Sequence, residues 1–277
     1  DIDGSLSANG TIDLGVNTGN SQGVKGIDVN GTTTAGGTIT METLSDGAIA
    51  THGAVESTAG SVNQTANGLL NGSINNASTV KAYTNVVESA DTTLTNAGAV
   101  TAGDEKATSG KVDLDAGGNI TNSSTVTGKT AVTMDSTGGN IANTGKVKSE
   151  TSTVTLNATS TKADTGAITN SAGIEAGTGI TLTAGNQITN SSTEEIKTAA
   201  GNIAMTSTNM GITNKGALSA IGSKGTITLT AENKTNGDIT NEEDVTADGN
   251  ITMTAGHDLV NNGEVKPING KVELNAG

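Results

Sequence analysis

Residues 249–263 have the sequence GNITMTAGHDLVNNG, which contains two short patterns that recur through the chain. The first is a pair of aliphatic residues separated by one residue, here Ile251 and Met253. Such alternation is typical of a β-strand that buries one face. From Val112 onward the pattern returns every 20 to 26 residues. It begins at Val112, Val132, Val154, Ile180, Ile203, Ile227, Ile251 and Val272, with Ile12 and Ile39 as earlier examples.

The second pattern is an aliphatic residue, one spacer and an asparagine, here Leu259 and Asn261. A third aliphatic residue usually follows six positions after the second pattern begins, as Val265 follows Leu259, although Ile196 follows Ile188 by eight. The asparagines of the second pattern are Asn76, Asn96, Asn122, Asn143, Asn170, Asn190, Asn214, Asn241 and Asn261.

Three short strands in each repeat predict an all-β fold, a right-handed parallel β-helix of about 12 coils with roughly 20 to 27 residues each. Each coil buries its aliphatic residues only by stacking on its neighbours. The asparagines share the inward parity of the aliphatic residue before them, which predicts an internal ladder of stacked amides. We expect residues 1–36 to form irregular first coils and residues 37–277 a regular shaft, cut at both ends from a longer solenoid.

Composition agrees with a thin interior. The 277 residues include no Cys, Trp or Phe and one Tyr, so aliphatic residues must supply the core. The net charge of −14 repels phosphate backbones, which argues against nucleic-acid binding. No apolar run approaches the roughly 20 residues needed to span a bilayer.

Residues 249–263, 118–126 and 180–190 resemble the repeat of the filamentous haemagglutinin family, and the resemblance covers at least residues 37–277. This family comprises large exoproteins of bacterial two-partner secretion. The resemblance implies export through an outer-membrane transporter and display on the bacterial cell surface. It also implies that the chain is a shaft projecting a distal tip, with a host-cell receptor or glycan as a further partner. The family's Asn-Pro-Asn-Gly secretion signal is absent, which favours an interior segment.

Two other functions compete with the shaft. A polymerising subunit of a filament or surface layer would use the same coils, with another copy stacked end to end. A glycan-active enzyme would need acidic residues converging on one face. Asp113 and Asp115 alternate outward on one strand, but Thr133 and Thr155 take the next equivalent positions. With no Arg and no aromatic platform for sugar rings, we expect neither catalysis nor a cofactor.

The remaining polar features favour plain surface roles. His52 and His257 are expected to be solvated loop residues. The acidic groups at 104–105, 194–195 and 242–244 could bind calcium weakly, but the nonapeptide calcium repeat is absent from the sequence. These groups are therefore expected to be solvated charges. Outward threonine pairs such as Thr226 and Thr228 would suit ice binding, but Asp113, Ala204 and Glu273 interrupt the array.

Insertions between the first and second patterns, such as 157–166 and 230–238, predict long loops along one edge, which is the candidate binding edge of the shaft. Sequons are frequent and include those at Asn63, Asn76, Asn122, Asn157, Asn190 and Asn233. Because Asn76, Asn122 and Asn190 belong to the predicted ladder, the candidate glycosylation sites are Asn157 and Asn233, which are expected in the long loops.

Overall fold

The computed structural model describes residues 1–16, 26–44, 46–160, 162 and 164–277. It confirms the predicted fold, a right-handed parallel β-helix of about 11 turns with three sheets and three strands in each coil. The chain divides into two compact units, Asp1–Met134 and Asp135–Gly277, and the boundary falls within β17 (Ala131–Ser136).

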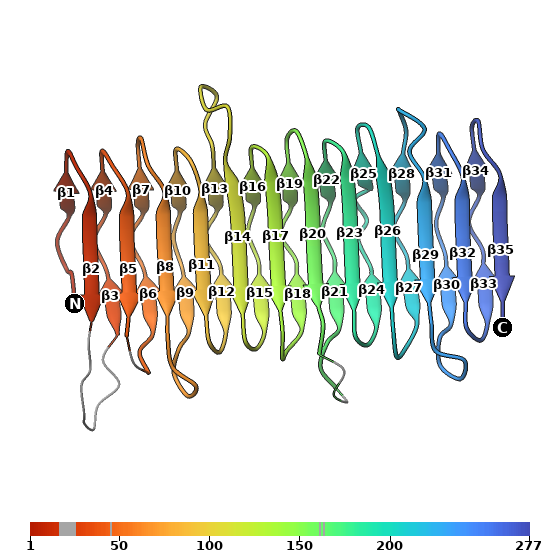
Figure 1. The fold of residues 1–277 in the computed structure, drawn as a ribbon, viewed down its shortest axis with the longest axis horizontal. Coiled ribbons are helices and arrows are strands. Elements are labelled where there is room, and N and C mark those ends of the chain that lie inside the picture. The colour runs from red at the N-terminus through yellow and green to blue at the C-terminus, as the bar shows by residue number, and fades with distance from the viewer. Residues whose placement is uncertain (17–25, 45, 161, 163) are drawn as a thin grey trace. The chain divides into compact units, whose positions relative to one another are not determined.

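In the N-terminal unit, the strands of each sheet lie side by side and pair in parallel (Figure 1). Sheet 1 contains β2 (Ile12–Val16), β5 (Ile39–Thr43), β8 (Val62–Ala66), β11 (Val86–Ala90) and β14 (Lys111–Ala116). Sheet 2 contains β3 (Ile27–Val29), β6 (Ile49–Thr51), β9 (Ile74–Asn76), β12 (Leu94–Asn96) and β15 (Ile120–Asn122). Sheet 3 contains β1 (Leu6–Ala8), β4 (Thr33–Ala35), β7 (Val55–Ser57), β10 (Val80–Ala82), β13 (Val100–Ala102) and β16 (Val126–Gly128).

The C-terminal unit repeats the same three sheets. Its sheet 1 contains β20 (Thr153–Ala158), β23 (Gly179–Ala184), β26 (Asn202–Ser207), β29 (Ile227–Ala231), β32 (Ile251–Ala255) and β35 (Val272–Ala276). Its sheet 2 contains β18 (Ile141–Asn143), β21 (Ile168–Asn170), β24 (Ile188–Asn190), β27 (Ile212–Asn214), β30 (Ile239–Asn241) and β33 (Leu259–Asn261). Its sheet 3 contains β19 (Val147–Ser149), β22 (Ile174–Ala176), β25 (Ile196–Thr198), β28 (Leu218–Ala220), β31 (Val245–Ala247) and β34 (Val265–Pro267).

The core of each unit consists of columns of equivalent residues in register. Ile180 pairs with Ile203, and Leu182 pairs with Met205, in successive coils of sheet 1. All four side chains are buried, whereas Thr181 between them is exposed. Burying an aliphatic side chain of this size contributes roughly 1.5–3 kcal/mol. The alternation read from the sequence therefore separates core from surface.

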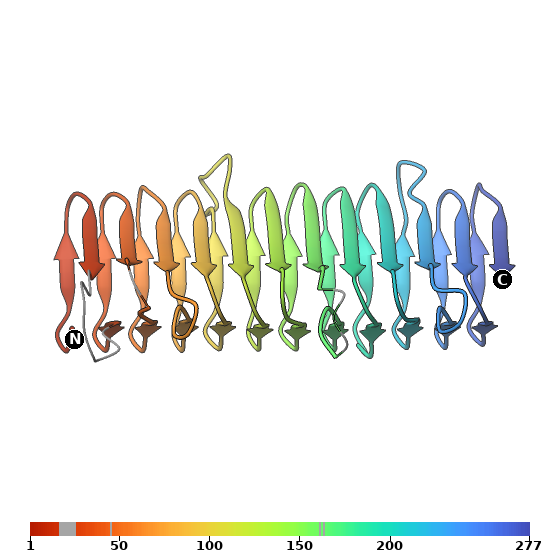
Figure 2. The ribbon, with the colours of Figure 1, turned by 60° about the horizontal axis from the view of Figure 1, so that its bottom comes forward.

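Longer loops leave the coils at two corners, and the expectation of a single long-loop edge is wrong. Loops 67–73 and 232–238 connect sheet 1 to sheet 2, as predicted. Loops 103–110 and 221–226 instead connect sheet 3 to sheet 1, and Figures 1 and 2 show them projecting beyond their neighbours, in yellow and cyan. A solenoid tolerates insertions at any corner where the strands on either side keep their register, because lengthening a loop costs little.

Gly201, just before β26, lies against the backbone of the preceding coil. A Cβ atom there would stand 1.4 Å from the carbonyl oxygen of Thr178. At Gly179 in β23, the nearest heavy atom to a Cβ would be 3.6 Å away, an ordinary contact. The two glycines therefore form a matched pair for testing how closely successive coils approach.

Gly201→Ala is expected to lower the free energy of unfolding by about 1–3 kcal/mol, because the backbone of the preceding coil must move. Gly179→Ala is expected to change it by less than about 1 kcal/mol, since the smaller entropy of the unfolded chain favours alanine where space exists. Urea unfolding followed by circular dichroism measures both. Equal losses for the two variants would contradict the close approach at Gly201.

Candidate functional site

The asparagines of the C-terminal unit form a continuous column of hydrogen bonds. In each step the Nδ2 atom of one asparagine donates to the Oδ1 atom of the next. The donor–acceptor distances are 2.7 Å (Asn143–Asn170), 2.9 Å (Asn170–Asn190), 2.8 Å (Asn190–Asn214), 2.7 Å (Asn214–Asn241) and 2.8 Å (Asn241–Asn261). The first five side chains are fully buried and Asn261 is partly buried. The predicted ladder is confirmed in this unit, from Asn143 to Asn261.

The same amides also hold the corner between sheet 2 and sheet 3. Nδ2 of Asn170 donates to the carbonyl oxygen of Ala172 at 2.7 Å, and Nδ2 of Asn214 donates to that of Gly216 at 2.8 Å. Each asparagine thus supports the turn that leads into the next strand. This explains why the second and third patterns keep an almost constant spacing. In the longer corner after Asn190, the Ser192 hydroxyl accepts from the backbone N–H of Glu194.

In the N-terminal unit the column begins with a residue that the asparagine pattern missed. The hydroxyl of Thr51 donates to Oδ1 of Asn76 at 2.7 Å, and Nδ2 of Asn76 donates to Oδ1 of Asn96 at 2.9 Å. Asn122 is buried, and its Nδ2 donates to the carbonyl of Ser124. Thr51 follows Ile49 at the ladder offset, so the spacing was a usable signal although the residue type differs.

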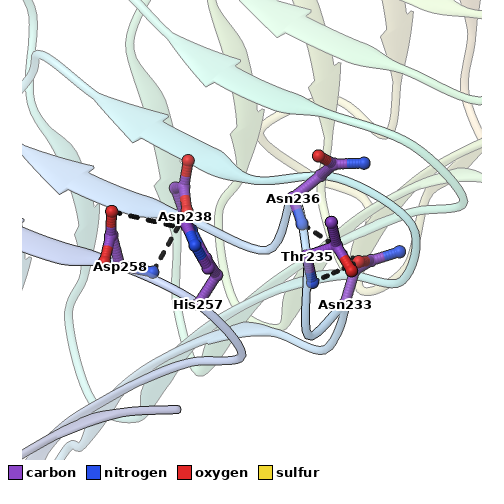
Figure 3. A network of polar contacts seen from close by, with 6 residues as sticks. All are labelled: Asn233, Thr235, Asn236, Asp238, His257 and Asp258. Atoms are coloured by element: carbon purple, nitrogen blue, oxygen red, sulfur yellow. Dashed lines mark hydrogen bonds and ion pairs between the residues drawn. The ribbon is translucent and has the colours of Figure 1, made fainter.

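Of the two candidate glycosylation sites, only Asn233 lies in a loop. Asn157 lies within β20, half-buried, with its Nδ2 donating to Oδ1 of Asp135 at 2.6 Å, so its expected loop placement is wrong. The strand continues through Ala158 because that residue is the third inward position. Oδ1 of Asn233 accepts the backbone N–H groups of Thr235 and Asn236 at 2.8 Å and 3.0 Å (Figure 3). The buried sequons Asn76, Asn122 and Asn190 cannot accept a sugar without disrupting the core.

Both histidines are exposed and lie outside the strands, as expected. Nε2 of His52 is 3.7 Å from Oδ1 of Asp28. His257 belongs to a tighter group, in which its Nδ1 lies 2.7 Å from Oδ1 of Asp238 and 3.6 Å from Oδ2 of Asp258 (Figure 3). The Asp238 oxygen also accepts the backbone N–H of Asp258 at 3.1 Å.

Among the residues that the structure describes, Asp238, His257 and Asp258 alone form a group of three side chains whose ligand atoms could hold a metal ion, all within 4.8 Å of one another. All three residues are exposed. An imidazole and two carboxylates are suitable ligand types. In an exposed group, however, water competes for the ion, and a hydrogen bond already joins the side chains of His257 and Asp238.

The hydrogen bond that the charged His257 donates to Asp238, with the nearby charge of Asp258, raises the pKa of His257 above its ordinary value. The same contact lowers the pKa of Asp238. Asp238→Asn is therefore expected to move the midpoint of the His257 titration downward, because the charged imidazole loses its partner. Asp258→Asn should lower it by less. NMR titration of the imidazole protons measures both, and a larger fall for Asp258→Asn would contradict the assigned contact.

The acidic groups considered for calcium binding contact backbone amides or lysines instead. Oδ1 of Asp104 accepts from the N–H groups of Lys106 and Ala107, both at 2.8 Å. Oδ1 of Asp244 accepts the N–H of Glu264 at 3.0 Å. Glu242 pairs with a lysine, Lys215, at 3.2 Å. These carboxylates support the corners of the coils.

A small hollow of about 190 Å³ lies over β19, β22 and β25 and is lined partly by Lys148, Glu175 and Lys197. Glu175 is held by Lys146 at 2.8 Å and Lys197 at 3.3 Å. The hydrogen bond from Lys146 lowers the pKa of Glu175, and that from Lys197 adds to the effect. A carboxylate held ionised in this way is unsuited to donate a proton to a leaving group, which hydrolysis of a glycoside requires.

Asp113 and Asp115 occupy outward positions on β14, as expected, and Asp113 pairs with Lys111 at 2.7 Å.

Among the residues that the structure describes, no helical segment could span a bilayer. Compared with known proteins, the chain matches no protein-family model, no curated protein and no solved structure.

Proposed function

We propose that this chain is a structural shaft segment of a large secreted bacterial surface adhesin, of the filamentous haemagglutinin type that its repeats resemble. The observation that carries the proposal is the asparagine column, which runs through the buried interior of successive coils. It adds a line of side-chain hydrogen bonds to three parallel sheets. Such a structure resists bending and separation of its coils, which suits a spacer that holds another part of the protein at a distance.

Export and location follow from the same proposal. The chain would cross the outer membrane through a partner transporter and remain at the bacterial cell surface. It would fold after export, outside the cell. Each coil would then stack on the preceding one, because only stacking buries its aliphatic residues. A host-cell receptor or glycan would be bound by the tip, with weaker contacts along the longer loops.

Whole-coil deletion in the full-length adhesin tests this function. Deleting 180–202 removes one repeat and leaves Ile203 in the position of Ile180, so the columns remain in register. Folding, surface display and adhesion are expected to persist. Deleting 180–191 removes most of β23 and all of β24 but leaves β25, and should abolish display. Loss of adhesion after the whole-coil deletion, with folding and display retained, would mean that this segment binds the receptor itself.

A polymerising filament or surface-layer subunit is the second candidate, because all coils stack through the same inward columns, which continue to β35 (Val272–Ala276). Val272 and Leu274 continue inward columns there, yet they are 41% and 45% exposed. In a polymer, the coil of a second copy would cover them. Sedimentation of the purified chain distinguishes the two. Concentration-dependent fibres that disappear in Leu274→Asp but persist in the outward Glu273→Lys would support polymerisation, and a monomer at all concentrations would count against it.

A further inference from the structure

Two polar side chains occupy the middle of the three inward columns of sheet 1 in the N-terminal unit. Gln64 on β8 and Glu88 on β11 are register partners in successive coils, and both are fully buried. The column continues to Met41 on one side and Leu114 on the other. Polar residues at such positions are uncommon because an unpaired buried charge is strongly disfavoured.

The contacts of this pair leave two oxygen atoms unused. Oε2 of Glu88 accepts from Nδ2 of Asn96 at 3.1 Å, whereas in the C-terminal unit the equivalent asparagine nitrogens donate along the column. Nε2 of Gln64 makes a long contact of 3.8 Å with the Met41 sulfur. The remaining Oε1 atoms of Gln64 and Glu88 are both buried and both lack a hydrogen-bond partner. These two oxygen atoms lie in neighbouring coils, and neither receives a hydrogen bond from a donor.

The strands packed against β11 bring no charge inward to neutralise Glu88. These strands are β8, β9, β10, β12, β13 and β14. Their ionisable side chains are Lys81 on β10 and Lys111, Asp113 and Asp115 on β14, all at outward positions. Within these described strands, the polar side chains that remain to contact the Glu88 carboxyl are amides.

We infer that below neutral pH Glu88 is a neutral carboxylic acid in the folded protein and that its Oε1–H group donates a hydrogen bond to Oε1 of Gln64. The proton comes from solvent and is taken up as the coils close. It converts one of the two unused acceptors into a donor for the other. The pair is then a proton-dependent clasp between the β8 and β11 coils, and it makes the N-terminal unit sensitive to pH.

The direction of the sensitivity follows from the pKa. Burial raises the pKa of Glu88 from 4.5 to about 7, although the Asn96 hydrogen bond opposes the rise. The stability linked to the neutral form is fully present below the unfolded value of 4.5, and it is lost as pH rises through about 7. The clasp therefore holds in mild acid and weakens above neutrality. A shift of this size corresponds to about a 300-fold change in the unfolding equilibrium constant at most.

The test compares the full chain with its Glu88→Gln variant. The amide keeps the shape, can donate to Gln64 Oε1 and does not titrate. Between pH 4 and pH 9, the unfolding equilibrium constant of the wild type is expected to rise about 100-fold more than that of Glu88→Gln. Glu42→Gln, an outward position on β5, removes a carboxylate elsewhere and should keep the wild-type profile. Parallel profiles for wild type and Glu88→Gln would overturn the inference.

A measurement on the wild type alone covers the case in which Glu88→Gln fails to fold. Carbon-13 NMR of the glutamate carboxyl groups should show one group that titrates near neutral pH in the folded protein. The absence of any such group would equally overturn the inference.

Discussion

Asn190→Leu is expected to lower the free energy of unfolding of the C-terminal unit by about 2–5 kcal/mol. Asn190 accepts from Asn170 at 2.9 Å and donates to Asn214 at 2.8 Å. Leucine has nearly the same volume but can make neither bond. Oδ1 of Asn214 and one N–H of Asn170 then lose their partners in a buried site, and each such loss costs about 1–3 kcal/mol. Urea unfolding followed by circular dichroism measures the effect.

The matched control is Thr189→Val, one residue earlier on β24 at an outward, half-buried position. It should change the free energy by less than about 1 kcal/mol. The double variant Asn190→Leu/Asn214→Leu should lose less stability than the sum of the two single variants. The reason is that Oδ1 of Asn214, which has no donor in Asn190→Leu, is absent from the double variant. Equal effects of Asn190→Leu and Thr189→Val would show that the column contributes nothing to stability.

Leu182→Asp is expected to lower the free energy of unfolding by roughly 4 kcal/mol or more, since it places a carboxylate in an apolar column. Leu182 is fully buried, and its register partners are Leu156 and Met205. None of these neighbours can donate a hydrogen bond to an oxygen atom. Thermal and urea unfolding measure the loss, which should diminish in acid as the new carboxylate becomes protonated.

Thr183→Asp is the control, because it introduces the same carboxylate one residue later on the outer face of β23. Its effect should stay within about 1 kcal/mol. The contrast between adjacent positions tests the parity of the strand directly. If both variants lost the same stability, the assigned inward and outward faces would be wrong.

The contrast with Glu88 shows why one buried carboxyl is tolerated. Glu88 has the Asn96 amide at 3.1 Å and Gln64 as its register partner, whereas position 182 has two apolar neighbours. The periodic patterns singled out neither Gln64 nor Glu88. Each follows a valine, Val62 or Val86, at the usual offset for an inward residue. A polar residue at an aliphatic position was thus the signal that could have revealed the pair.

The sequence by itself determined the repeat, the three strands of each coil and the inward parity of the asparagines. These follow from local alternation and fixed offsets, which depend only on backbone geometry. The step from Asn170 to Ile174 is short because the Asn170 amide donates a hydrogen bond to the carbonyl of Ala172. This contact is local, so the spacing at the corner could also be predicted from the sequence.

The tertiary structure alone decided which side chains contact one another, both within a coil and between neighbouring coils. It places Asn157 on a strand beside Asp135, brings His257 to Asp238 and turns the Asn96 amide to Glu88. The atoms that make these contacts belong to residues 8 to 22 positions apart. Coil lengths vary, so the partner of a loop residue depends on how each insertion folds, and no local pattern records that choice.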